Sequence, residues 1–456
     1  MISLKRLLVY LFIFFLFFPP EKRDAYSSEF AIIFSGEELG NLEPCGCYEG
    51  QLGGIAKRYS FIDFFRKQKN PVLPISLGDL SKSCSRQDEI KTEILCRALR
   101  LMGYVLHNLG EKDIEINPQI LSFLSQTHSV DFLSTNVNID TPFPIKINQS
   151  VIKECFDLGS PVKIAFLGIL SKSLLGSNVS EYITVSEPIK ALKPFVTQLR
   201  NRVNLIVLLS HAPLEESREI AQHFPEIGFI IAGHNIEEPK DSTTYVHNTP
   251  IISSGTGGKH IGIAKYVINN KIIERKSVEV IPLDHTYNDS QEMGVLLQEY
   301  QHILTEEGLL SKIPQAPLPN GLSYTGSFAC SVCHKIIYDH WYKTTHAKSY
   351  NTLVGVGYQY DPECIKCHTT GYGDVSGFLN YEKDQNLIDV GCESCHGAGN
   401  KHIKNVNDAY GSTDERSCTV CHDSEHSLKF QYKEYWERIA HPKESLKKLP
   451  ENSKSK

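Results

Sequence analysis

The sequence predicts two folds in one chain: an α/β domain in the larger N-terminal part and a mainly α-helical, strand-poor region at the C-terminus. Three observations predict this division. Short apolar runs alternate with helical patterns as far as residue 232. A proline-rich stretch follows at residues 313–320. Beyond it, the motif C-x-x-C-H occurs four times between residues 330 and 422.

The chain begins with the pattern of an export signal. Lys5 and Arg6 precede an unbroken apolar run over residues 7–18, which Pro19, Pro20 and a charged segment end. This run is short for a membrane-spanning helix and typical of a signal peptide. We expect residues 1–26 to direct the protein to a bacterial periplasm. An uncleaved signal would be its membrane anchor.

The expected elements of the α/β domain, residues 27–285, follow in order. Apolar runs predict strands at 30–35, 71–77, 104–109, 131–137, 162–170, 204–210 and 227–232. Apolar stripes at helical spacing predict helices at 53–67, 90–102 and 213–224. From 244 to 282 the pattern changes to successive strands with little helix.

Polar side chains follow five of these predicted strands. They are Glu37, Asp79, Glu111, His211 and His234. Each alone is typical of a loop or a helix cap. In open α/β sheets, however, ligands bind at the carboxyl ends of the strands. Two interpretations therefore stay open, namely polar strand ends or a metal or catalytic site.

The segments G-N-L-E-P (40–44), G-G-I-A-K-R (53–58), G-D (78–79), S-H (210–211) and G-H-N (233–235) carry a resemblance. Residues 30 to 285 resemble the calcineurin-like metallophosphoesterases, in particular the periplasmic 5′-nucleotidase branch. The resemblance implies a four-layer αββα sandwich. It also implies a two-metal site that hydrolyses a small-molecule phosphate ester.

The match to the family's metal ligands is incomplete. Asp79, His211 and His234 stand at ligand positions, and Glu37 stands at the place of the first aspartate. Leu39 falls where the family has a ligating histidine.

Three further positions depart from the family pattern. In the G-N-H-D/E motif, Glu111 replaces the asparagine ligand and Lys112 the histidine that assists the leaving group. Ile236 falls where the family has its last ligand. The departures imply a degenerate scaffold, or one divalent metal (Mn, Zn or Fe) held by the retained ligands and a carboxylate.

Five cysteines lie outside the C-x-x-C-H motifs, at Cys45, Cys47, Cys84, Cys96 and Cys155. Cys45 and Cys47 are too close in sequence for an unstrained bridge to each other. Either one pairs with Cys84 or Cys96, or a thiolate replaces a lost metal ligand. The sequence leaves both open.

Residues 286–320 form the expected linker, because a helical pattern over 288–312 ends in the proline-rich stretch. Residues 321–445 contain the four motifs, and a polar tail follows at 446–456. The motif residues are Cys330, Cys333, His334; Cys364, Cys367, His368; Cys392, Cys395, His396; and Cys418, Cys421, His422.

C-x-x-C-H is the attachment signature of c-type haem. Two thiols three positions apart reach the vinyl groups on one edge of a porphyrin, and the histidine ligates the iron. Structural zinc sites are the alternative, but they give no reason for a histidine after every second cysteine. We therefore expect four covalent haem c groups. The motifs lie close together among few aliphatic residues, so we expect the haems to form the core of this region.

The C-terminal region resembles the tetrahaem cytochromes that accept electrons from hydroxylamine oxidoreductase. The residues that carry this resemblance are W-Y-K-T-T-H-A (341–347), C-H-T-T-G-Y (367–372) and G-C-E-S-C-H-G-A-G-N-K-H (391–402). It implies that His346 and His402 are distal iron ligands and that one haem keeps an open face. His426 and His441 compete for the remaining distal positions, and we expect His340 to be a bystander.

We therefore expect an exported tetrahaem cytochrome that carries electrons between redox partner proteins. Two enzymatic alternatives remain: a metal-dependent phosphate-ester hydrolase, and a haem oxidoreductase acting on a small nitrogen or sulfur compound. The formal net charge of -6 provides no basic surface for a nucleic-acid partner.

Overall fold

The computed structural model describes residues 28–44, 50–68, 71–127, 130–155, 161–176, 180–234, 239, 243–269, 272–407, 410–423, 426–427 and 429–442. The expected export signal, Cys45, Cys47 and Ile236 lie outside these residues. No helix in the described ranges has the length and apolar character needed to cross a membrane. The described residues form two compact units. One comprises the described residues within 1–37, 61–79 and 100–281, and the other those within 38–60, 80–99 and 282–456.

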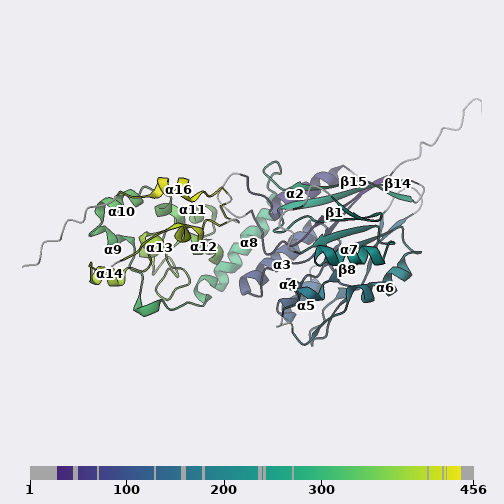
Figure 1. The fold of residues 1–456 in the computed structure, drawn as a ribbon, viewed down its shortest axis with the longest axis horizontal. Coiled ribbons are helices and arrows are strands. Elements are labelled where there is room, and N and C mark those ends of the chain that lie inside the picture. The colour runs from purple at the N-terminus through teal and green to yellow at the C-terminus, as the bar shows by residue number, and fades with distance from the viewer. Residues whose placement is uncertain are drawn as a thin grey trace, which may run out of the picture. The chain divides into compact units, whose positions relative to one another are not determined.

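The first unit is built on two large sheets (Figure 1). The seven-stranded sheet has the order β15 (Ile272–Pro282), β14 (His260–Asn269), β1 (Ser28–Ser35), β2 (Val72–Ser76), β3 (Leu106–Asn108), β4 (Asp131–Leu133) and β6 (Ile147–Asn148). The six-stranded sheet has the order β12 (Thr244–Val246), β13 (Thr249–Ile252), β11 (Phe229–Gly233), β10 (Leu205–His211), β8 (Val162–Leu170) and β7 (Val151–Cys155). Strands β1 to β4 are parallel, as are β8, β10 and β11.

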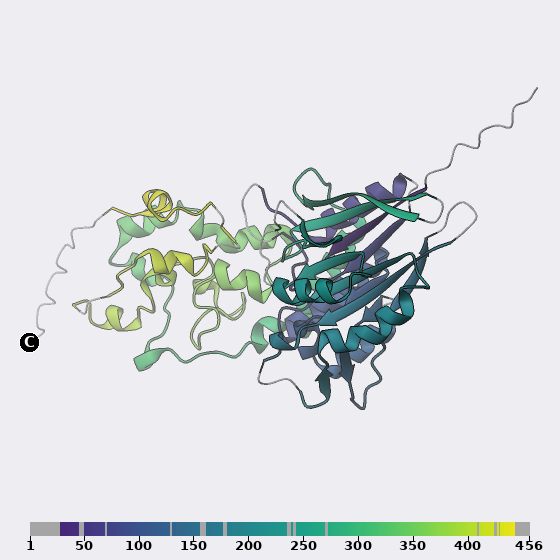
Figure 2. The ribbon, with the colours of Figure 1, turned by 45° about the vertical axis from the view of Figure 1, so that its right-hand side comes forward.

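The inner faces of the two sheets pack against each other. Phe34 of β1 and Phe229 of β11 meet edge to face with ring centroids 5.9 Å apart, inside one continuous apolar cluster. The outer face of the six-stranded sheet packs against α6 (Pro188–Leu199) and α7 (Leu214–His223), which Figure 2 shows in teal. Because β1 and β2 are parallel neighbours, the chain must cross over between them, and this crossover contains α2 (Ile55–Lys67). The other sheet covers the inner face of the seven-stranded sheet, so the crossover can pass only over its outer face. The predicted four-layer αββα arrangement is thereby confirmed.

The sequence predicts one strand at 131–137, but the structure contains two. β4 ends at Leu133, and β5 (Val137–Ile139) pairs with β9 (Ile183–Val185) in a separate two-stranded sheet. The turn between them is set by Asn136, whose amide nitrogen donates to the carbonyls of Leu170 and Ser186 at 2.7 and 2.8 Å. A buried side-chain amide thus redirects the chain where apolar periodicity predicts continuity.

The C-terminal region consists of short helices joined by irregular segments (Figure 1). They are α9 (Ser327–Ser331), α10 (Lys335–Trp341), α11 (Ser349–Val356), α12 (Pro362–His368), α13 (Cys392–His396), α14 (Asn400–Lys404), α15 (Glu415–Thr419) and α16 (Tyr432–Ile439), and the longer α8 (Gln291–Glu307) precedes them. This confirms the helical, strand-poor fold expected there.

The apolar core of this region is small. It contains Tyr350, Leu353, Ile365 and Phe378 among its few buried members. Large apolar side chains are instead exposed around the C-x-x-C-H motifs. Val332 and Val420, each inside a motif, are 79% and 63% exposed. The polypeptide therefore leaves apolar surface next to its cysteines, where a porphyrin would cover it.

The second unit also contains most of α3 (Arg86–Leu101), which contacts the C-terminal helices. Lys91 is 2.5 Å from Glu363 of α12, and Gln87 donates to Asp361 at 2.8 Å. Arg97 binds Glu299 of α8 through both carboxylate oxygens at 2.6 Å. The helix that carries the second C-x-x-C-H motif is thus fixed to α3 by charged and polar contacts.

Asn108 and Gly168 form a close contact between the two sheets. The amide nitrogen of Asn108, at the end of β3, donates to the carbonyls of Leu77 and Ile169 at 3.2 Å each. A Cβ atom on Gly168 of β8 would lie 1.9 Å from the Asn108 side-chain oxygen. Only glycine fits this position without displacing the amide.

We expect Gly168→Ala to lower the free energy of unfolding of the holoprotein by about 1–3 kcal/mol, because the added methyl overpacks the contact. Gly176→Ala is the control, since no atom lies within 4 Å of a Cβ built there. Urea unfolding followed by far-UV circular dichroism measures both. Equal stability of the two variants would contradict the assigned role of this contact.

Candidate functional site

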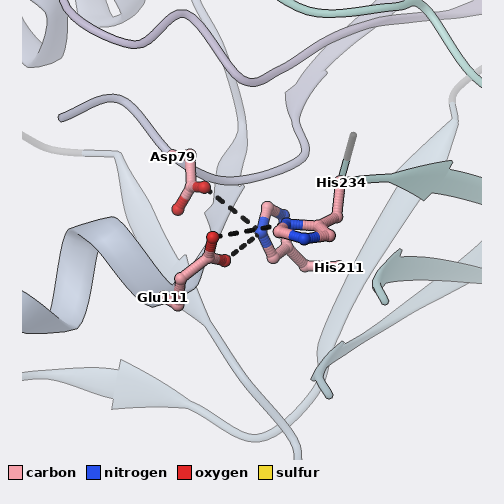
Figure 3. Close-up of side chains that lie close together, drawn as sticks. All are labelled: Asp79, Glu111, His211 and His234. Atoms are coloured by element: carbon pink, nitrogen blue, oxygen red, sulfur yellow. Dashed lines mark hydrogen bonds and ion pairs between the residues drawn. The ribbon is translucent and has the colours of Figure 1, made fainter. Parts of the chain in front are cut away.

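Four side chains meet at the carboxyl edge of the two sheets (Figure 3). Asp79 follows β2, and Glu111 begins α4 (Glu111–Glu115) just after β3. His211 ends β10, and His234 follows β11. One ligand atom of each lies within 4.8 Å of the others. Each sheet contributes two members, so the cluster exists only because the sheets pack face to face. We call these four residues the α/β cluster.

Three of the four members of the α/β cluster are buried, and charge holds the cluster together. His211 Nε2 lies 2.5 Å from Glu111 Oε2 and 3.3 Å from Asp79 Oδ2, and His234 Nδ1 lies 3.3 Å from Glu111 Oε1. Burial, partly opposed by His211, raises the pKa of Asp79 to about 6. Burial acts to lower the pKa of His211, but the two carboxylates outweigh it and hold that pKa well above its ordinary value.

These residues fit a divalent metal. Two imidazoles and two carboxylates are the donors that zinc, manganese and iron accept. In the cluster the two carboxylates favour a positive charge on the His211 imidazole. A cation would supply the same positive charge with both histidines neutral, which is the form that binds metal.

The backbone around the α/β cluster is in an unusual conformation. Glu37, Asp79 and His234 have φ angles of 52°, 53° and 81°, in the left-handed region that non-glycine residues rarely adopt. Such residues each cost about 1–3 kcal/mol and gather at functional sites. Gly110 also fits closely, since a Cβ there would lie 2.0 Å from Asp79 Oδ1. The fold thus maintains a strained arrangement that brings the cluster together.

A second buried carboxylate supports Asp79, and the sequence analysis missed it. Asp113 Oδ2 accepts from the backbone N–H groups of Asp79 and Gly110 at 2.8 and 2.9 Å. It also lies 3.0 Å from His107 Nε2, whose other ring nitrogen is 2.8 Å from Ser76 Oγ. Asp113 is the last residue of the G-E-K-D segment, and this position could have indicated its role.

Glu37 lies beside the cluster, but its carboxylate binds a backbone N–H group and is not among the cluster's converging ligand atoms. Its Oε1 accepts a hydrogen bond from the backbone N–H of His234. The set of converging ligand atoms contains the other four predicted residues. Lys112 directs its Nζ toward Glu115 at 3.4 Å and gives its backbone N–H to Asp79 Oδ1 at 2.9 Å.

In the C-terminal region, three pairs of histidine rings face each other. The ring centroids are 6.3 Å apart for His334 and His402, 6.3 Å for His346 and His422, and 6.1 Å for His396 and His441. Two metal–nitrogen bonds of about 2 Å on opposite sides of one ion place the ring centroids roughly 6 Å apart. Each pair joins one motif histidine to one histidine outside the motifs, so the spacing fits an iron between them.

The fourth motif histidine is oriented differently. His368 Nδ1 donates to the carbonyl of Ser349 at 2.7 Å, which leaves Nε2 as the ligand atom. Among the described residues, no second imidazole faces His368 at the spacing of the three pairs. His426 is exposed, and its Nδ1 lies 2.8 Å from the carboxylate of Asp423.

The cysteines show which motifs are neighbours. A hydrogen bond from the Cys330 thiol lowers the pKa of Cys392 to about 7, and Cys421 does the same for Cys367. The first and third motifs therefore meet at their cysteines, as do the second and fourth. Groups attached at these motifs would be neighbours in two pairs.

Glu393, inside the third motif, is a buried anchor that the motif itself does not reveal. It is 2% exposed, and its carboxylate accepts from the backbone N–H groups of Thr325, Gly326 and Gly399. The three distances are 2.9, 2.7 and 2.7 Å. One carboxylate thus joins the segment before α9 to the segment after α13.

Comparison with known proteins divides the chain in the same way. A family model described as cytochrome c554 and c-prime matches residues 329–397. Cytochrome c-554 of Nitrosomonas europaea is 33% identical over an alignment of 91 residues, and the match covers 17% of this chain and 39% of that protein. A 2′,3′-cyclic-nucleotide 2′-phosphodiesterase/3′-nucleotidase of Salmonella typhimurium is 22% identical over an alignment of 260 residues, and the match covers 48% of this chain and 39% of that protein.

A solved 5′-nucleotidase precursor from Thermus thermophilus superimposes with a TM-score of 0.53 at 15% identity, covering 71% of this chain and 68% of that one. The chain spans about two fifths of the length of the curated relatives it matches. It joins a c554-like cytochrome region to a domain with the metallophosphoesterase fold, and both predicted resemblances are confirmed.

We expect Glu393→Ala to destabilise the C-terminal region by about 3 kcal/mol or more, because it leaves several buried N–H groups without an acceptor. Glu382→Ala, at an exposed position of the same region, is the control. Thermal unfolding of the holoprotein, followed by circular dichroism in the haem absorption band, measures the effect. A transition unchanged from that of the control would contradict the anchoring role.

Proposed function

We propose that the protein is a periplasmic tetrahaem c-type cytochrome that carries electrons between partner proteins. Residues 321–445 would form its haem domain, residues 286–320 a linker, and residues 27–285 a phosphoesterase-like domain that has lost its hydrolytic site. The three facing histidine pairs are the observation that carries the proposal. A haem group, once bound, supplies reversible one-electron transfer at its iron.

The imidazole pairs support a proposal for the iron ligands. His334 would bind with His402, His422 with His346, and His396 with His441, while His368 would be the protein ligand on one side of the remaining haem. His346 and His402 are the distal ligands that the sequence resemblance implies. For the remaining distal position the geometry favours His441 over His426. Ligation by two histidines lowers the reduction potential compared with histidine and methionine and keeps small molecules from the iron.

The chain's own residues hold these ligands in place. His368 and His396 each donate Nδ1–H to a backbone carbonyl, of Ser349 and Gly411, at 2.7 Å. Such bonds fix the tautomer and the ring orientation and increase the basicity of Nε2. The two pairs of adjoining motifs would bring neighbouring haems within short electron-transfer distance. This arrangement suits conduction along the domain.

A second candidate function is oxidoreduction of a small nitrogen or sulfur compound. The observation that favours it is the ring of His368, which faces no second imidazole among the described residues. The haem attached there would have an accessible iron. The third candidate, phosphate-ester hydrolysis, is weaker, because Leu39 and Ile236 offer no donor atoms at two ligand positions.

The iron content and ligand binding of the holoprotein test the electron-carrier proposal. We expect about four irons per chain, because each motif attaches one haem, and cyanide binding at no more than one of them. Iron well below four would contradict the central claim. Turnover of hydroxylamine, nitrite or sulfite at the cyanide-binding haem would favour the oxidoreductase instead.

Two matched variants test the assigned distal ligand. We expect His441→Ala to convert one low-spin haem to a high-spin form that binds cyanide, because its iron loses one imidazole. His426→Ala should leave every haem in its original spin state. Electron paramagnetic resonance and the optical spectrum measure both. A spin change in the His426 variant alone would reverse the assignment.

A further inference from the structure

We propose that the α/β domain binds one divalent transition-metal ion, not two, through Asp79, Glu111, His211 and His234. The inference goes beyond electron transfer and does not depend on the assignment of the haem ligands. It concerns a site different from the pair of metals that the fold resemblance implies. Three independent observations carry it.

The first observation is that the four side chains form a complete ligand set. Their donor atoms lie within 4.8 Å of one another, and three of the four residues are buried. Four protein ligands satisfy the tetrahedral preference of zinc and leave positions open for manganese or iron. Calcium and magnesium prefer all-oxygen sites, so two imidazoles argue against them.

The second observation is the charge of Glu111. Compared with the asparagine of the family pattern, Glu111 adds a negative charge at a ligand position. With neutral histidines, Asp79 and Glu111 together balance one divalent cation. Glu111 reaches both halves of the cluster, since one carboxylate oxygen lies 2.5 Å from His211 Nε2 and the other 3.3 Å from His234 Nδ1.

The third observation comes from the sequence, where two positions that match ligands of the family pattern have no donor atom in their side chains. Leu39 and Ile236 have hydrocarbon side chains where the family pattern has histidines. The remaining carboxylate there, Glu37, accepts the backbone N–H of His234. That bond holds His234 in its left-handed conformation, with φ of 81°, beside the cluster. Glu37 has thus become a positioning residue for one of the ligands of the single ion.

A single ion changes what the domain can do. In a two-metal phosphoesterase, the pair of ions clamps the attacking and the leaving oxygens of the phosphate. One ion cannot form that clamp, and Lys112 stands where the family has the histidine that assists the leaving group. The proposed site therefore either stabilises the strained strand ends or binds a single anionic ligand, without phosphoesterase turnover.

The test measures metal stoichiometry on the haem-loaded protein. The holoprotein is treated with a chelator, dialysed, and titrated calorimetrically with Zn²⁺ alone and with Mn²⁺ alone. Haem iron does not interfere, because it is not exchanged. We expect one equivalent of at least one of these ions to bind per chain, and its binding to raise the unfolding temperature of the α/β domain.

Three variants place the ion. His211→Ala should abolish the stoichiometric binding. Glu111→Gln, which keeps the shape and removes the charge, should weaken it by about tenfold or more. His223→Ala changes an exposed histidine of the same domain and should bind as the wild type does. Far-UV circular dichroism verifies folding, and Glu111→Gln remains informative if His211→Ala fails to fold.

Each contrary result overturns the proposal. Two equivalents in the wild type would show that the second metal position survives, and no binding of either ion would show that the cluster is a purely structural ion pair. Unchanged binding in both His211→Ala and Glu111→Gln would place the ion elsewhere. None of these results affects the spin states of the haems, so the test is separate from that of the electron-carrier proposal.

Discussion

The first unit depends on the apolar contact between the inner faces of its two sheets. Burial of Phe34, Phe166 and Phe229 in this contact fixes the sheets against each other. It also brings the carboxyl ends of β2 and β3 opposite those of β10 and β11. Without it, Asp79 and Glu111 on one sheet would not meet His211 and His234 on the other. The α/β cluster is therefore a consequence of sheet packing.

The second unit is organised on a different principle. Its polypeptide supplies a small apolar core, short helices and exposed apolar residues around the cysteines. Polar contacts, such as those of Glu393 and those between α3 and α12, hold some of the helices in position. We interpret the haems as the missing core. The iron ligands and the stability of this unit would then be inseparable, because each distal histidine also connects two distant segments of the chain.

The two halves of the molecule relate differently to the proteins they resemble. The cytochrome region has the four C-x-x-C-H motifs, and we propose His346 and His402 as distal ligands. The α/β domain has the metallophosphoesterase fold, and we propose that it holds one metal position where the resemblance implies two. A fold can host unrelated functions, and only its site shows which one it performs. In this chain the changed site argues against phosphoesterase activity, even though the scaffold is preserved.

The sequence by itself determined the features that are local along the chain. The C-x-x-C-H motif contains both attachment cysteines and the histidine within five residues. The apolar runs predict parallel strands, and the polar residues that follow parallel strands lie at one edge of the sheet. It also placed the helix at 288–312 close to where α8 lies. The tertiary structure decided everything that depends on distant segments. It split the strand expected at 131–137 through the hydrogen bonds of Asn136, and it turned Glu37 toward a backbone N–H.

The same holds for the choice of distal partners. The sequence ranks His441 slightly below His426, but in the structure His441 faces the motif histidine His396 with ring centroids 6.1 Å apart. Likewise, nothing in the C-E-S-C-H motif shows that Glu393 gathers three backbone N–H groups. Such pairings follow from the paths of loops between short helices. Those paths depend on packing over the whole unit, and a pattern of residues along the chain does not predict that packing.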